Sequence, residues 1–239
     1  VSGPPSSGGS QGGITADGGL IFINSDPQNT SVSGGTVNLN ISTSSNNYRI
    51  SSRASFWNLN LTRSISSGSN HFRVVGGTVG DDVASESTIE NQPLIVRNNL
   101  TITGPNNPTL SMEGDPAADL YIHGNLEMGS GAVYIHNNNR THFVGSSNSS
   151  LTFAGATKPF YNVVVDKDLE SRNLNIQQTG PNPSMDILGS LFLEKDTSIH
   201  VVLTVGEELR LDDPEGFSIY PNPASDLIIV ESSRSAIES

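Results

Sequence analysis

Hydrophobic and polar residues alternate in many short runs along the chain, beginning at residue 19. Residues 36–41 read Thr-Val-Asn-Leu-Asn-Ile, and residues 120–122 read Leu-Tyr-Ile. A period of two is typical of a strand with one buried face, whereas a helix repeats every 3.6 residues. No window keeps the helical period over several turns, so the pattern predicts an all-β chain.

The runs are short and are separated by turn sequences such as Gly34-Gly35 and Gly124-Asn125. A β-sandwich usually has longer strands and a more aromatic core. Short strands with small residues at the corners favour a solenoid, whose coils each contribute two or three strands and stack about 4.8 Å apart in parallel. We therefore predict a parallel, right-handed β-helix over residues 19–206. An antiparallel sandwich would contradict it.

Three pairs of similar segments indicate internal repeats. The pairs are residues 56–61 with 160–165, residues 122–128 with 187–193, and residues 103–108 with 179–183. In the first pair, Phe56 and Phe160 each start an aromatic-Asn-aliphatic run. We therefore expect both rings at equivalent inward positions on their coils. The spacing of the pairs varies, which predicts insertions at the coil corners.

Two of these segments resemble the β-helical repeat regions of large Bacteroidetes surface proteins. Residues 120–128 have the form aliphatic-x-aliphatic-x-Gly-Asn-Leu-x-aliphatic, and residues 160–165 have the form Phe-Tyr-Asn-aliphatic-x-aliphatic. The resemblance lies in the general sequence pattern of short strands and turns, and it extends roughly over residues 19–205. It implies a β-helical fold and a place at the cell surface.

The segment over residues 217–230 reads Phe-Ser-Ile-Tyr-Pro-Asn-Pro-Ala-Ser-Asp-Leu-Ile-Ile-Val. Proline fixes φ and aspartate holds turns, so the local pattern predicts strand, turn and strand. The segment resembles the opening of the C-terminal sorting domain of type IX secretion cargo. On that resemblance, the sorting motif consists of Tyr220, Pro221, Asn222, Pro223, Asp226, Leu227 and Ile229. The resemblance implies a small β-sandwich domain and export through the periplasm to the cell surface or the medium.

Composition divides the chain into four segments. Residues 1–18 are rich in Gly, Ser and Pro, which is typical of a flexible linker. The predicted solenoid over residues 19–206 follows, and residues 207–216 form an acidic linker. Like charges stacked in adjacent coils would repel. We therefore expect residues 217–239, the truncated start of the sorting domain, to be a unit separate from the rod.

Composition and charge exclude several classes of protein. The net charge is −12, which is unfavourable for binding nucleic acid or an anionic membrane. The chain has no cysteine, and therefore no disulfide and no thiolate ligand. No apolar run is long enough for a membrane-spanning helix. Val1 in place of an initiator methionine predicts that a leader was removed or that the chain is a fragment.

The sequence contains no strong catalytic or metal-binding motif. The five histidines lack the spacing of a zinc site, and neither Gly-x-Ser-x-Gly nor a phosphate-binding loop is present. Acid pairs are the residue type that a structural calcium ion or a polysaccharide-active enzyme would use. They occur at Asp81-Asp82, Asp115 and Asp119, Asp166 and Asp168, and Asp212-Asp213. We expect solvated loop charges there, and predict no catalytic residue, cofactor or metal.

Outward aromatic rings would favour a sugar-binding surface, and the candidates are Trp57, Tyr121, Tyr134 and Tyr161. The favoured interpretation is that Trp57 and Tyr161 only cover a face, while Phe56 and Phe160 pack inside. Asparagine at coil corners predicts left-handed backbone conformations or side-chain ladders between coils.

Together these features predict an exported, non-enzymatic β-solenoid that acts as a stalk, adhesin or matrix component at the cell surface. One alternative is a polysaccharide-active enzyme or carbohydrate-binding module on the same scaffold. Another is a self-assembling extracellular structural protein that uses its end coils as strand templates. The predicted partner is the type IX secretion machinery. Surface polysaccharides, other surface proteins and further copies of the chain are additional candidates.

Overall fold

The computed structural model describes residues 19–23, 31–44, 48–52, 54–74, 93–113, 117–155, 158–168, 172–179, 185–194, 198–202, 210–211, 217–221 and 227–232. Every regular element in these residues is a β-strand, so the predicted all-β class is confirmed for this part of the chain. A helix able to cross a membrane is absent from these ranges.

The strands are, in chain order, β1 (Gly19–Ile23), β2 (Thr36–Ile41), β3 (Tyr48–Ser52), β4 (Asn58–Arg63), β5 (Phe72–Val74), β6 (Leu94–Val96), β7 (Leu100–Ile102), β8 (Thr109–Met112), β9 (Leu120–Ile122), β10 (Leu126–Met128), β11 (Val133–Ile135), β12 (Arg140–Gly145), β13 (Ser149–Ala154), β14 (Lys158–Phe160), β15 (Asn162–Lys167), β16 (Asn173–Thr179), β17 (Met185–Ile187), β18 (Leu191–Glu194), β19 (Ser198–Val202), β20 (Arg210–Leu211), β21 (Phe217–Pro221) and β22 (Leu227–Ser232).

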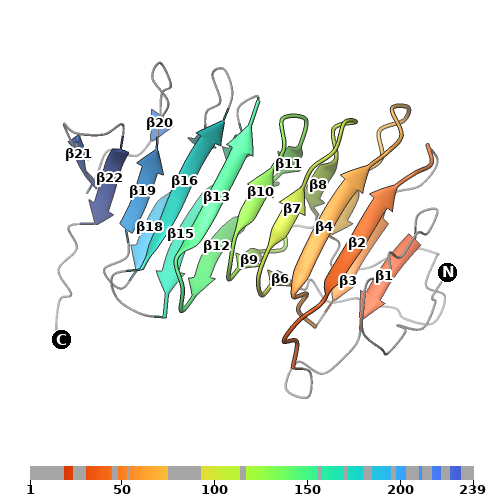
Figure 1. Cartoon of the computed structure of the whole chain (residues 1–239), viewed down its shortest axis with the longest axis horizontal. Coiled ribbons are helices and arrows are strands. Elements are labelled where there is room, and N and C mark those ends of the chain that lie inside the picture. Colours follow the sequence, from red (N-terminus) through yellow and green to blue (C-terminus); the bar gives the residue numbers. More distant parts are fainter. Residues whose placement is uncertain are drawn as a thin grey trace.

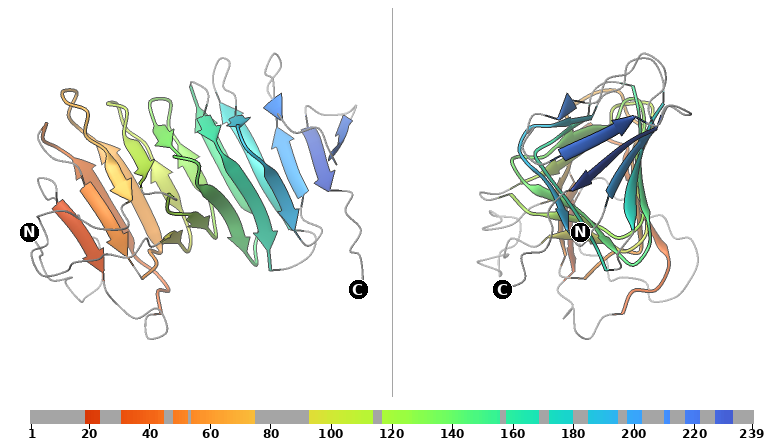
Figure 2. Two further views of the ribbon diagram at one scale, coloured as in Figure 1. Left: turned by 180° about the vertical axis from the view of Figure 1, so that it is seen from behind. Right: turned by 90° about the vertical axis from the view of Figure 1, so that its left-hand side faces the viewer.

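The chain winds around a common core, and its strands align side by side in long sheets (Figure 1). Sheet A has the order β2-β4-β7-β10-β13-β16-β19-β22-β21, sheet B the order β1-β3-β5-β8-β11, and sheet C the order β18-β15-β12-β9-β6. Sheet D has the order β14-β17-β20 and meets sheet B where β14 contacts β11. From β5 to β19 the chain passes through sheet B or D, then C, then A. Each coil therefore adds one strand to each face, and successive coils overlay when viewed along the rod (Figure 2).

Neighbouring coils pair in parallel and in a constant register. Leu100, Leu126, Leu151 and Ile176 occupy the same position on successive strands of sheet A, so one coil takes 25 or 26 residues. Leu59 and Leu100 are also paired, although they lie 41 residues apart in sequence. The additional length includes residues 75–92, outside the described ranges. The predicted parallel β-solenoid is therefore confirmed.

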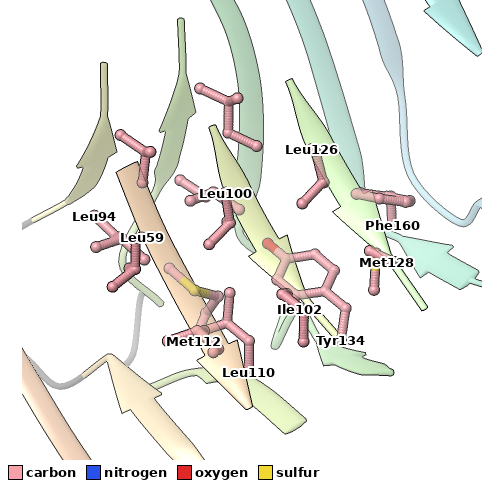
Figure 3. Close-up of a cluster of buried hydrophobic side chains, with 14 of the residues drawn as sticks. Leu59, Leu94, Leu100, Ile102, Leu110, Met112, Leu126, Met128, Tyr134 and Phe160 are labelled. Atoms are coloured by element: carbon pink, nitrogen blue, oxygen red, sulfur yellow. The ribbon is translucent and has the colours of Figure 1, made fainter. Parts of the chain in front are cut away.

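The apolar residues of each alternating run point into the rod. Leu59, Leu100 and Leu126 of sheet A are no more than 2% exposed, and Ile122 and Val165 of sheet C are fully buried. Equivalent side chains lie above one another in adjacent coils and form continuous apolar columns (Figure 3). Burial of apolar surface, at about 25 cal/mol per Å², is the main contribution to the stability of such a core.

The internal repeats lie at coil corners, but the two members of the first pair lie at corners that lead into different sheets. Phe56 and Phe160 are both buried, as predicted, with exposed fractions of 4% and 0%. The run after Phe56 enters β4 of sheet A, whereas the run after Phe160 enters β15 of sheet C. The prediction that the two rings occupy equivalent coil positions is therefore wrong.

The other two pairs show that similar sequences occur at corners that lead into different sheets. Residues 122–128 enter sheet A and residues 187–193 enter sheet C, whereas Thr103 and Thr179 do occupy the same position three coils apart. At the corners into both sheets, a small residue passes close over the preceding coil. A Cβ on Gly124 would lie 2.3 Å from the Asn98 carbonyl oxygen, and one on Gly189 would lie 2.8 Å from that of Tyr161. Similar corner geometry therefore selects similar sequence.

The C-terminal strands lie at the end of sheet A. β22 pairs with β19 and β21 pairs with β22, both antiparallel, whereas every other described strand pair is parallel. β20 lies inside the predicted acidic linker and pairs in parallel with β17 of sheet D. The sandwich domain and the segment boundaries at residues 18, 206 and 216 stay predictions, and residues 1–18 lie outside the described ranges.

Candidate functional site

The predicted sorting motif falls on the terminal hairpin. Four of its residues belong to β21 and β22, namely Tyr220, Pro221, Leu227 and Ile229. Tyr220 pairs with Ile229 across the two strands. The remaining three residues lie outside the described ranges: Asn222, Pro223 and Asp226. The structure places part of the motif on paired strands, and its sorting role stays a prediction.

The candidate metal ligands are dispersed over the rod. Within the described ranges, no three His, Asp or Glu side chains are placed to hold a metal ion. Several of the acid pairs fall outside these ranges: Asp81, Asp82, Asp115, Asp212 and Asp213. Asp119, in contrast, contacts His142, with 3.3 Å between Oδ2 and Nε2.

The four candidate aromatic residues have different surroundings. Trp57, Tyr121 and Tyr161 are half-buried on the outside of the rod. Tyr134 points inward and is 3% exposed. Its hydroxyl lies 3.0 Å from Thr141 Oγ1, and burial raises the pKa of this phenol. Tyr134 is therefore a core residue and cannot contact a sugar at the surface.

The outer face of sheet C combines aromatic and ionisable side chains. Its outward positions form three rows along the rod. The first row is Asp119, Arg140, Asn162 and Ser190, and the central row is Ile95, Tyr121, His142, Val164 and Phe192. The third row is Arg97, His123, Val144 and Asp166, and its register continues to Glu194 on β18. Every residue of the central row is apolar or aromatic. From β2 to β16 the corresponding row of sheet A is polar: Asn38, Asn60, Thr101, Glu127, Thr152 and Gln177.

Aromatic rings on sheet C and its corner stack between coils. The ring centroids of Tyr121 and His142 lie 4.2 Å apart and their planes differ by 8°. His136 and Tyr161 stack at 5.7 Å and 18°. Rings stacked along the rod turn their faces toward each other and their edges toward solvent. A sugar ring needs an open aromatic face, so these two pairs are better suited to joining coils than to binding glycans.

Asp119 links this stack to the neighbouring strand. Its second oxygen, Oδ1, accepts a hydrogen bond from the backbone N–H of Arg140 at 3.1 Å. Burial acts to raise the pKa of Asp119, but the hydrogen bonds from His142 and Arg140 outweigh it and hold that pKa below its usual value. Asp119 is therefore ionised at neutral pH and holds the His142 ring by its Nε2 atom.

His123 is held in its neutral form on the same face. Burial lowers the pKa of His123, and the positive charge of Arg97 lowers it further. The Arg97 Nη1 atom lies 3.1 Å from His123 Nε2. Because arginine only donates, Nε2 is the acceptor and Nδ1 carries the proton.

Asparagines form ladders at the corner between sheets C and A. Asn58 Oδ1 accepts from the backbone N–H of Asn99 at 3.2 Å, Asn99 Oδ1 from Asn125 at 3.4 Å, and Asn125 Oδ1 from Ser150 at 2.9 Å. The predicted left-handed asparagines are also present at positive φ: Asn107, Asn137 and Asn138. Both predicted uses of corner asparagine are therefore confirmed.

Sequence reasoning missed a set of buried cations. Lys167 is fully buried, and its Nζ donates to the carbonyl of Val144 and the hydroxyl of Ser149. Lys158 Nζ donates to the carbonyl of Ala132 at 2.6 Å. The signal was the strand period, because Lys167 continues the inward alternation of its strand. These ammonium groups bind backbone and hydroxyl oxygens and have no substrate-facing side.

Comparison with known proteins adds no assignment, since no family model, curated protein or solved structure matches this chain.

Proposed function

We propose that this chain is a structural or adhesive rod of the bacterial cell surface, exported by type IX secretion. The observation that carries the proposal is the use made of outward side chains. The Asn99–Asn125 ladder and the Tyr121–His142 stack each join one coil to the next. Such contacts stiffen a solenoid along its axis, which is what a stalk or spacer requires.

The net charge and the C-terminal motif support the proposed location at the cell surface. A net charge of −12 with few lysines keeps a surface protein soluble and limits non-specific binding. The strand-turn-strand pattern around Tyr220 and Pro221 is the part of the chain that resembles sorting domains of type IX cargo. In this proposal the solenoid serves as the structural part of the protein, and the C-terminal segment directs its export.

Export is tested with the full chain behind a periplasmic signal peptide and a fluorescent reporter, in a bacterium with active type IX secretion. We expect the reporter on the cell surface or in the medium. A chain ending after Val202 and a secretion-deficient host are the two controls, and both should retain the reporter in the periplasm. Equal surface delivery with and without the C-terminal segment would contradict the proposed route.

The alternative with a specific observation in its favour is a polysaccharide-active enzyme. The Asp119–His142 pair has the arrangement in which a carboxylate orients an imidazole, as in general-base catalysis. The test is to incubate the purified chain with neutral and acidic polysaccharides and to measure new reducing or unsaturated ends. The rod proposal predicts none. Product formation that is lost in His142→Ala would support the enzyme instead.

A further inference from the structure

The two long faces of the rod differ in a way that the strand period does not require. Both sheets place one outward residue per coil in a central row. From β2 to β16 these residues of sheet A are all polar, whereas in sheet C they run Ile95, Tyr121, His142, Val164 and Phe192. Phe192 is 39% exposed, and Leu188 at the adjoining corner is 50% exposed. A row of apolar and aromatic side chains on one face of a polar rod indicates an interface.

The charged residues beside this row lie where a two-fold axis would bring opposite charges together. Along the third row, Arg97 adjoins β6 and Asp166 lies on β15. Along the first row, Asp119 precedes β9 and Arg140 lies on β12. These four side chains sum to zero charge in a chain whose net charge is −12. Two copies that repel each other overall can therefore approach through this face.

We propose that a second copy of the chain docks on sheet C, face to face, with the two rods antiparallel. The two-fold axis runs parallel to the strands and passes between β9 and β12. It keeps each row opposite itself and places β9 opposite β12 and β6 opposite β15. The interface is closed, so it produces dimers and no fibres.

The pairing follows directly from this symmetry. Arg97 faces Asp166 of the second copy, and Asp119 faces Arg140, so both charge pairs are opposite in sign. In the central row, Ile95 faces Val164. Each pair occurs twice in an isologous interface. If the two-fold axis were moved by half a strand spacing, onto β12, Arg140 would face Arg140 of the second copy. The repulsion between these like charges disfavours that register.

The size of the face sets the strength of the dimer. Four strands at about 4.8 Å spacing, with three outward residues each, give an interface of roughly 1,000 Å² in total. Interfaces of this size are at the low end for specific complexes. We therefore expect association that depends on concentration, and sedimentation over a wide range of protein concentration as the primary measurement. The purified chain suffices, so the outcome does not depend on the proposed export or adhesion.

The absence of native cysteine allows a sharp crosslinking test. Ile95 and Val164 lie three strand spacings apart within one chain, about 14 Å, but face each other across the proposed interface. The variant Ile95→Cys/Val164→Cys, treated with a bis-maleimide shorter than that separation, should give covalent dimer. Thr101→Cys/Gln177→Cys is the matched control, because its positions lie three spacings apart on sheet A. Equal dimer yields from the two variants would overturn the proposal.

Charge reversal tests the register. Arg97→Glu and Asp166→Arg each place like charges opposite each other and should weaken the dimer about tenfold or more. The double variant should restore dimerisation to within about threefold of the parent chain. Glu127→Arg on sheet A is the control and should have little effect. A chain that stays monomeric at every concentration, or binds a glycan through sheet C as a monomer, would overturn the proposal. Circular dichroism and thermal unfolding verify that each variant is folded.

Discussion

The side-chain oxygen of Asn125 accepts hydrogen bonds from both the backbone N–H and the hydroxyl of Ser150, at 2.9 and 2.8 Å. Ser150 occupies the same corner position one coil later. The amide nitrogen of Asn125 donates to Asn99 Oδ1, in the preceding coil, at 3.1 Å. One side chain therefore joins three coils, in addition to the backbone hydrogen bonds of the sheets.

Asn125→Ala should lower the free energy of unfolding by about 1 kcal/mol, because it removes hydrogen bonds on both sides of the coil. Urea denaturation followed by circular dichroism measures the change. Glu127→Ala is the matched control, since Glu127 is an exposed outward residue on the same strand, β10. Similar losses in the two variants would show that the ladder contributes nothing specific.

Gly124→Ala should destabilise the rod by about 1–3 kcal/mol, the usual cost of forcing an added methyl into a packed site. The new Cβ would lie 2.3 Å from the carbonyl oxygen of Asn98, a backbone atom of the preceding coil. Gly34 has no atom within 4 Å of an added Cβ and no positive φ. Gly34→Ala should therefore leave the melting temperature unchanged, and a comparable drop in both variants would contradict the steric explanation.

The strands and the solenoid class could be predicted from the sequence because both depend on local pattern. The Leu-Tyr-Ile run at residues 120–122 encodes its two buried positions and its outward one without reference to the rest of the chain. The structure confirms that assignment, with Leu120 and Ile122 buried and Tyr121 half-buried. Corner asparagines were predictable for the same reason.

Coil register could not be predicted because it depends on distant contacts. Phe56 and Phe160 begin the same local pattern, yet they precede strands of different sheets, since the pattern describes a corner without saying which corner. The Tyr121–His142 stack joins residues 21 positions apart and exists only once β9 and β12 are aligned. The outer face of sheet C, with its rows, follows from that alignment.

Phe160→Ala should cost about 3–5 kcal/mol, the range for removing a large aromatic side chain from a packed core. Phe160 is fully buried, and its ring centroid lies 5.3 Å from that of Tyr134. Phe192→Ala removes the same group from an outward site and should cost less than about 1 kcal/mol when measured in dilute protein. Chemical denaturation of both variants decides the point. A loss at Phe160 no larger than at Phe192 would contradict the core assignment.

Lys167 provides a prediction about pH. Burial lowers the pKa of its ammonium to about 8, and the nearby charge of Asp168 opposes only part of that shift. Unfolded, the same group has its ordinary pKa of 10.5. Between these two values the folded chain has lost the proton and the unfolded chain keeps it, so unfolding takes up a proton. Stability from this group therefore rises as pH increases from 8 to 10.5.

The variant Lys167→Met isolates this contribution, because it removes the titrating group and keeps an apolar side chain of similar length. The unfolding free energy of the parent chain minus that of the variant should increase by about 3 kcal/mol between pH 7 and pH 10.5. Other groups that titrate in this window, Lys158 among them, are present in both proteins and cancel in the difference. Guanidinium denaturation at several pH values supplies the numbers. A difference that stays constant with pH would mean that Lys167 keeps its proton in the folded rod, and that its two oxygen partners compensate for its burial.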